Sequence, residues 1–206
     1  MKKILFVLLL LSSTPAFAQR YPPPRDIDAL PYRDQFSLWL GPTAGGSFGT
    51  SNFSGYNGWN YGGRIRFELP RSPINFIADI SYNPMVARTS PDVFIGRYLT
   101  VVVPGEEYWT SILSIGGGIE FTFPRVFTTP YLSLDFAYYA IKPDGFEQIN
   151  RQGIGIGLGT VFSRPDAPIG FGLEAKYRFS NLFGGESGEG NINYFQLTFS
   201  LMFRAI

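Results

Sequence analysis

The chain alternates large apolar residues with small or polar ones over most of its length, and this pattern constrains the fold more than any other feature. It is clearest near the end, where Phe195, Leu197, Phe199, Leu201 and Phe203 occupy every second position. Successive residues of a β-strand point to opposite faces, so a period of two predicts strands with one apolar and one mostly polar face.

We predict eight strands, and the connections between them differ in length. The strands span about 35–48, 58–69, 74–83, 108–123, 130–140, 152–162, 169–179 and 194–203. Connections 70–73, 124–129 and 163–168 are short, whereas 49–57, 84–107, 141–151 and 180–191 are longer. A tilted strand of about 9–11 residues crosses a bilayer. Short turns on one side and longer loops on the other are typical of an all-β, antiparallel up-and-down transmembrane barrel with periplasmic turns.

The N-terminus has the three parts of a secretory signal peptide. Lys2 and Lys3 precede an apolar run over residues 4–11, and the small residues Ala16 and Ala18 define a cleavage site after Ala18. This order is typical of export. The apolar run is shorter than the roughly 20 residues of a membrane-spanning helix. We therefore expect an exported protein in the bacterial outer membrane.

The remaining chain divides into two parts. Residues 19–34 are rich in proline and charge, so we interpret them as an extended periplasmic leader. Residues 35–206 carry the alternation and form the predicted barrel domain. The sequence thus predicts a signal peptide over residues 1–18, a leader and one barrel.

Composition removes several classes of function. The chain contains neither cysteine nor histidine, so it lacks thiol chemistry, the commonest general base and the commonest metal ligand. Its 17 basic and 16 acidic residues leave a formal net charge of +1, which gives no indication of nucleic-acid binding. We expect no enzymatic activity, no metal and no cofactor.

The charges within the predicted strands all lie on the face opposite the large apolar side chains. They are Arg64, Arg66, Glu68, Asp79, Glu120, Asp135, Glu174, Lys176 and Arg178. A charge facing lipid near the midplane costs about 2–4 kcal/mol, so this sorting favours a barrel with its polar face inside. Inside a narrow barrel four positive and five negative charges must pair. Two interpretations remain open: a closed ion-pair network that fills the lumen, and a polar pathway or gate.

The connection 84–107 is unusually apolar for a loop. Its apolar residues include Phe94, Ile95, Tyr98, Leu99, Val101 and Val103. It either folds back on itself as a hairpin above the membrane or offers a surface to a partner, because exposed strand edges pair readily with other chains.

The signal peptide, the eight alternating segments, the short turns and the aromatic final strand together resemble the small outer-membrane barrels of the OmpA and OmpX type. The resemblance covers about Gln35 to Ile206. It implies outer-membrane lipid and lipopolysaccharide as surroundings, and insertion by the barrel-assembly machinery. OmpX-type barrels use extracellular extensions for adhesion, which implies an extracellular protein partner for 84–107.

Our hypothesis from the sequence is a monomeric outer-membrane barrel whose lumen is sealed by ion pairs and whose extracellular loops serve a structural or surface-interaction role. The first alternative is a narrow channel for small solutes, because the polar face is lined with glycine and charge. The second is a soluble periplasmic barrel that binds an apolar ligand, since alternation alone also fits a soluble barrel.

Overall fold

A computed structural model describes residues 35–89, 92–95, 100–103, 105–123, 128–163, 167–183, 190 and 192–206. The predicted signal peptide and leader, residues 1–34, lie outside these ranges. The described residues belong to one compact unit, Pro31–Ile206. Within them, no helix is long and apolar enough to span a bilayer.

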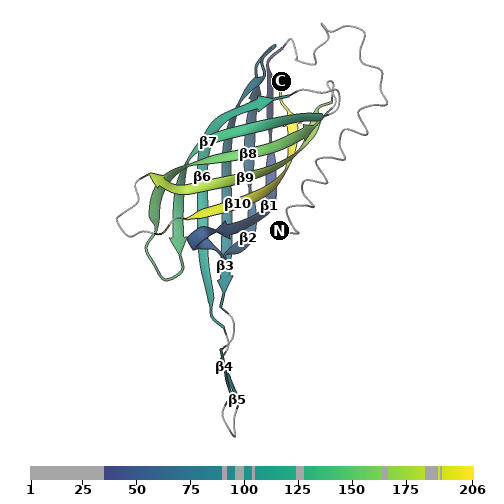
Figure 1. Cartoon of the computed structure of the whole chain (residues 1–206). Coiled ribbons are helices and arrows are strands. Elements are labelled where there is room, and N and C mark those ends of the chain that lie inside the picture. Colours follow the sequence, from purple (N-terminus) through teal and green to yellow (C-terminus); the bar gives the residue numbers. More distant parts are fainter. Residues whose placement is uncertain are drawn as a thin grey trace. The chain divides into compact units, whose positions relative to one another are not determined.

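Eight antiparallel strands close into a barrel, which confirms the predicted fold class (Figure 1). They are β1 (Ser37–Thr50), β2 (Asn57–Glu68), β3 (Ile74–Arg88), β6 (Glu107–Thr122), β7 (Thr128–Pro143), β8 (Ile149–Phe162), β9 (Ile169–Phe183) and β10 (Asn193–Arg204). Each strand pairs with its neighbour in this order, and β1 pairs with β10 to close the wall.

Several strands run further than the alternation indicates. β3 ends at Arg88 and β7 at Pro143, several residues beyond the predicted ends. Backbone pairing continues here although the outward residues are no longer consistently apolar. Two of the predicted longer connections are therefore short: residues 51–56, which contain the 3-10 helix η1 (Ser51–Phe53), and residues 144–148.

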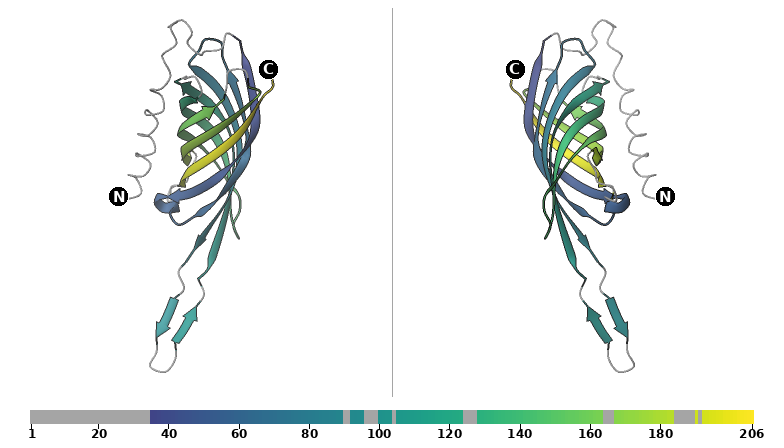
Figure 2. Two further views of the ribbon diagram at one scale, coloured as in Figure 1. Left: turned by 90° about the vertical axis from the view of Figure 1, so that its right-hand side faces the viewer. Right: turned by 90° about the vertical axis from the view of Figure 1, so that its left-hand side faces the viewer.

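The register of the strands sets the width and tilt of the barrel (Figure 2). The paired residues can be followed from strand to strand around the barrel, starting at Ser37 of β1. They are, in turn, Glu68, Asn75, Glu120, Ser133, Gly157, Lys176 and Gln196. Gln196 pairs with Ser47, which lies on β1 again. One circuit thus shifts the register by ten residues, from 37 to 47. With a rise of about 3.3 Å per residue and a strand spacing of about 4.8 Å, this shift corresponds to a tilt of roughly 40°.

The two ends of the barrel differ. The end with the β2–β3, β6–β7 and β8–β9 connections and the C-terminus is called the turn end, and the opposite end is called the loop end. At the loop end, pairing of β3 with β6 runs through Arg88 and Glu107. The Thr89 N–H then donates to the Glu106 carbonyl, and the Thr89 hydroxyl accepts from the Glu106 N–H. Beyond these residues, β4 (Asp92–Ile95) and β5 (Thr100–Val103) pair with each other as a two-stranded sheet.

Large apolar side chains cover the outer wall. Near the turn end the exposed aromatics are phenylalanines: Phe36, Phe76, Phe121, Phe123, Phe162, Phe171 and Phe203. Near the loop end they include Trp59, Tyr61, Trp109 and Tyr138. The opposite residues of each strand face the lumen and are mostly polar and buried. The barrel is therefore apolar outside and polar inside.

Glycines on the inner face of β8 make room for the charged side chains. A Cβ atom on Gly157 would collide with the Ser133 hydroxyl and lie 3.0 Å from a carboxylate oxygen of Glu174. A Cβ on Gly155 would meet the Asp135 carboxylate in the same way. The interior of an eight-stranded barrel is only wide enough to be filled by side chains, so these bare positions let longer neighbours reach the centre.

Candidate functional site in the barrel lumen

The nine charged residues that the sequence assigns to the lumen all lie on the inner faces of β2, β3, β6, β7 and β9. Seven of them are buried: Arg64, Arg66, Glu120, Asp135, Glu174, Lys176 and Arg178. The side chain of Asp79 is 10% exposed and that of Glu68, near the turn end, is 23% exposed. The structure brings all nine into contact with opposite charges.

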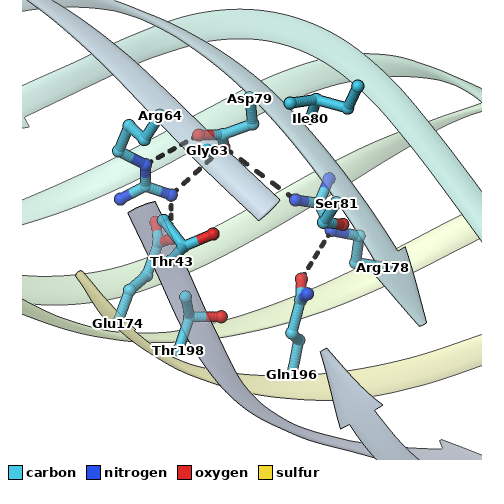
Figure 3. A pocket seen from close by; sticks show the side chains of 10 residues that line it. All are labelled: Thr43, Gly63, Arg64, Asp79, Ile80, Ser81, Glu174, Arg178, Gln196 and Thr198. Carbon is cyan, nitrogen blue, oxygen red and sulfur yellow. Dashed lines mark hydrogen bonds and ion pairs between the residues drawn. The ribbon is translucent and has the colours of Figure 1, made fainter. Parts of the chain in front are cut away.

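Arg64 connects three strands in the middle of the lumen (Figure 3). Its Nε and Nη2 donate to the two carboxylate oxygens of Asp79 on β3 at 2.7 and 3.1 Å. Nη2 also donates to Glu174 on β9, and Nη1 donates to the Tyr131 hydroxyl on β7 at 3.2 Å. Bidentate arginine–carboxylate contacts are among the stronger and more directional hydrogen bonds. This guanidinium therefore links β2 to its neighbour β3 and, across the lumen, to β7 and β9.

Lys176 and Arg178 on β9 extend the network to β7. The ammonium of Lys176 lies 2.6 Å from Asp135 and 3.3 Å from both Asp79 and Glu174. Nη1 of Arg178 donates to the other Asp135 oxygen at 2.9 Å. Because the two cations share one carboxylate, the central charges form one connected network.

Arg66 and Glu120 form a second pair nearer the turn end. Nε of Arg66 lies 2.7 Å from Glu120, although the N–H is not aligned for a hydrogen bond. Nη1 of Arg66 lies 3.6 Å from Glu68, and its guanidinium lies 5.6 Å from the centre of the Tyr131 ring. Nη1 of Arg64 approaches Glu120 at 3.8 Å, so the pair joins the central network.

Toward the loop end, the lumen is lined by neutral polar side chains in place of charged ones. Nε of Arg178 donates to Gln196 at 3.0 Å, and Gln196 donates to Asn83 at 3.1 Å. Asn83 also accepts from the Ser47 hydroxyl at 2.8 Å, donates to Ser81 at 3.2 Å and donates to the Ile112 carbonyl at 3.2 Å. This layer satisfies its own polar groups without needing a ligand.

An apolar cluster lies inside the barrel at the loop end, and sequence reasoning missed it. We call it the apolar cap: Phe53, Met85, Ile112, Ala137, Tyr139, Ile141 and Tyr194. Three of its members, Met85, Ile112 and Ile141, stand at inward positions of otherwise polar faces. These departures from the alternation are the sequence feature that could have indicated the cap. Phe53 lies in a connection between strands, where no alternation exists to be interrupted.

Four of the six residues proposed from the sequence as a partner loop lie in the second sheet. Phe94 and Ile95 lie in β4, and Val101 and Val103 lie in β5. Phe94 is in register with Val101. Tyr98 and Leu99 lie outside the described residues. The structure thus shows a hairpin in this segment.

Space inside the described lumen is scarce. A small cavity lies between the Arg64–Asp79 pair and Arg178, and its lining also includes Thr43, Gly63, Ile80, Ser81, Glu174, Gln196 and Thr198 (Figure 3). No set of three or more acidic side chains in the described residues is placed to hold a metal ion. The arrangement suits mutual neutralisation of charge more than the binding of a sizeable ligand.

Comparison with known proteins defines the class of the fold. No protein-family model and no curated protein sequence matches the chain. Neisserial surface protein A has a similar structure, with a TM-score of 0.58, 16% identity, and coverage of 82% of this chain and 98% of that one. The N-terminal barrel domain of Pseudomonas aeruginosa OprF gives a TM-score of 0.46 at 15% identity, covering 82% of this chain and 99% of that one. Ail of Yersinia pestis gives 0.43 at 15% identity, covering 84% and 99%.

The chain therefore has the closed eight-stranded fold of small outer-membrane barrel proteins. The similarity to the Neisserial protein supports this assignment, and at 16% identity it extends to the fold alone.

Replacement of Lys176 by methionine should lower the free energy of unfolding by about 3–5 kcal/mol, because Asp79, Asp135 and Glu174 would lose a shared buried cation. Urea unfolding of the refolded protein in detergent measures this change. The matched control is Lys142→Met, at an exposed residue of β7, which should change stability by less than about 0.5 kcal/mol. Equal effects of the two changes would contradict a cohesive role for the network.

Two buried tyrosines of the apolar cap should respond differently to loss of their hydroxyl group. The Tyr139 hydroxyl accepts from Arg178 at 3.3 Å, so Tyr139→Phe should cost about 1–2 kcal/mol. The Tyr194 hydroxyl is buried without a hydrogen-bond partner among the described residues, so Tyr194→Phe should be neutral or stabilising. The same unfolding assay compares them, and a larger loss for Tyr194→Phe would refute the described packing.

Proposed function

We propose that the protein is an integral outer-membrane barrel with a closed lumen, which acts as a structural or surface-interaction protein through its loop end. The observation that carries this proposal is the sorting of side chains: an exposed apolar outer wall surrounds a lumen whose charges pair with one another. The outer face of the wall suits contact with lipid, and the inner face suits contact with polar and charged groups.

The outer wall supports insertion into a lipid bilayer. Outward charges on the described strands, Arg88, Glu107 and Lys142, gather at the loop end. Between the loop-end tyrosines and tryptophans and the turn-end phenylalanines, the wall is aliphatic and aromatic. Transmembrane barrels carry such an apolar band between aromatic girdles. An exposed apolar belt of this extent would make a soluble periplasmic barrel prone to aggregation.

The packed lumen supports a closed barrel in preference to the channel alternative. The ion pairs connect β2, β3, β6, β7 and β9 across the interior, so their side chains occupy the space that a solute would need. Removing one partner of a buried pair leaves an uncompensated charge. Exchange of partners is therefore costly, and the network acts as a structural brace.

The hairpin β4–β5 supports a surface-interaction role. It comprises four residue pairs, and in the described chain it pairs with no other strand. An isolated two-stranded hairpin is marginally stable in water, and its edges offer unpaired backbone groups to another chain. An extracellular protein that adds a strand to this hairpin is the partner that this geometry suits. Lipopolysaccharide and other outer-membrane lipids would surround the monomeric barrel after insertion by the assembly machinery.

The topology can be tested with single cysteines, because the natural chain has none. Phe146 at the loop end is 75% exposed and Ile206 at the turn end is 68% exposed. A membrane-impermeant thiol reagent added to intact cells should label Phe146→Cys and leave Ile206→Cys unlabelled. Ile206→Cys should react once the outer membrane is opened. The reverse pattern, or release of the protein by alkaline carbonate, would refute the proposal.

The hairpin should be dispensable for the barrel itself. Joining Thr89 to Glu106 through Asn-Gly removes residues 90–105 and keeps the β3–β6 backbone bonds that precede them. This variant should match the full chain within about 0.5 kcal/mol in unfolding free energy, because the hairpin pairs only with itself among described residues. A loss of several kcal/mol would mean that the segment stabilises the barrel and is not reserved for a partner.

A further inference from the structure

The apolar cap has the position and the composition of a barrier to water and ions. Met85, Ile112, Tyr139, Ile141 and Tyr194 are each 0% exposed, although they come from β3, β6, β7 and β10 on different sides of the lumen. They therefore pack together inside the lumen as one apolar layer. Apolar constrictions of this kind stop conduction by excluding water.

The turn end of the lumen is built differently. Trp39 and Tyr131 are buried there, but they share the layer with the ion pair of Arg66 and Glu120. Glu68 next to this pair is partly exposed, at 23%. Water that enters from the turn end thus meets charged groups, whereas water that enters from the loop end meets the apolar cap first.

The connection between β1 and β2 places Phe53 over the cap. Phe53 is 7% exposed and its ring stacks on Tyr56 with centroids 4.2 Å apart. A Cβ atom on Gly49 would collide with the Phe53 carbonyl, so glycine at this position allows the close approach. Ser51, where η1 begins, has a φ of 54°, in the left-handed region that costs a non-glycine residue about 1–2 kcal/mol.

Polar groups next to the cap are satisfied by the protein. Asn83 has four hydrogen-bond partners in the lumen, and the Ser180 hydroxyl donates to the Ile192 carbonyl. These groups need no water, and the Tyr194 hydroxyl is the polar atom of the cap that has no hydrogen-bond partner among the described residues.

We propose that the apolar cap is a second seal, in series with the ion-pair network, and that it alone closes the lumen toward the cell exterior. The inference rests on the proposed membrane-spanning barrel and deepens its closed-lumen part. The ion pairs brace the wall and contact water from the periplasmic side, while the cap excludes water and ions from the outside. Loss of charge in the network therefore leaves the barrel closed as long as the cap is intact.

A cysteine below the cap reports on this seal. Thr198 lines the small cavity of the network and is 8% exposed. On intact cells, a small membrane-impermeant cationic thiol reagent should fail to label Thr198→Cys. Adding Phe53→Ser and Ile112→Ser should speed its labelling at least about tenfold, which corresponds to a barrier lowered by about 1.4 kcal/mol. The matched background, Phe53→Leu with Ile112→Val, keeps the layer apolar and should stay unreactive.

A third background separates the two seals. Arg66→Ala with Glu120→Ala removes a pair of the network and leaves the cap intact, so Thr198→Cys should stay unlabelled from outside. Labelling of Thr198→Cys from outside in this third background, or in the chain that carries no other substitution, would overturn the proposal. Unchanged labelling after the two serine replacements would also overturn it, provided that the variant resists carbonate extraction and that Phe146→Cys reacts. Failure of those two controls would instead count against the membrane-spanning barrel itself.

In planar bilayers, the same logic predicts that the full chain and the Arg66→Ala, Glu120→Ala variant insert without discrete currents, because the cap is intact in both. Steady currents from the charge variant with an intact cap would show that the ion pairs alone seal the lumen.

Discussion

The contacts of Asp79 and Asp135 with the cations of β2 and β9 are the interactions on which the rest of the barrel depends. Each carboxylate faces cations in the narrow interior, and neither could remain charged there alone. Through Arg64, Lys176 and Arg178 they connect strands that are not neighbours in the wall. The lumen is therefore a set of paired charges whose side chains fill the cross-section that the strand register sets.

This constraint explains the sorting of residues along every strand. Charges gathered inside leave the outer wall apolar, and that wall suits a lipid solvent in which backbone groups must be paired. Closure of β1 onto β10 meets the backbone requirement because it removes the two free edges of the sheet. Glycines on β8 leave room inside the lumen. The side chains of Asp135, Glu174 and Lys176 occupy the space that larger side chains on β8 would fill.

The sequence was sufficient for the fold class and for the face on which each strand residue lies, because both follow from a period of two. The sequence did not predict which charged residues pair with one another. Lys176 meets Asp135, 41 residues away, through the register of β7 with β8 and of β8 with β9, and no local pattern encodes these registers. The apolar cap was not predicted for a related reason. Met85, Ile112 and Ile141 are single apolar residues on the polar faces of three different strands, and they come together only when the barrel closes.

The pairing of β1 with β10 also bears on how the chain reaches this state. It brings Trp39 beside Arg204, so the last seam joins the two ends of the barrel sequence. Contacts between such distant residues form slowly, because a long segment must lose its freedom before they are made. Hairpins of neighbouring strands can form early, but the lumen charges find all their partners only at closure. A half-closed sheet would lack the contacts between distant strands, such as that of Arg64 with Glu174, which makes the final step of folding cooperative.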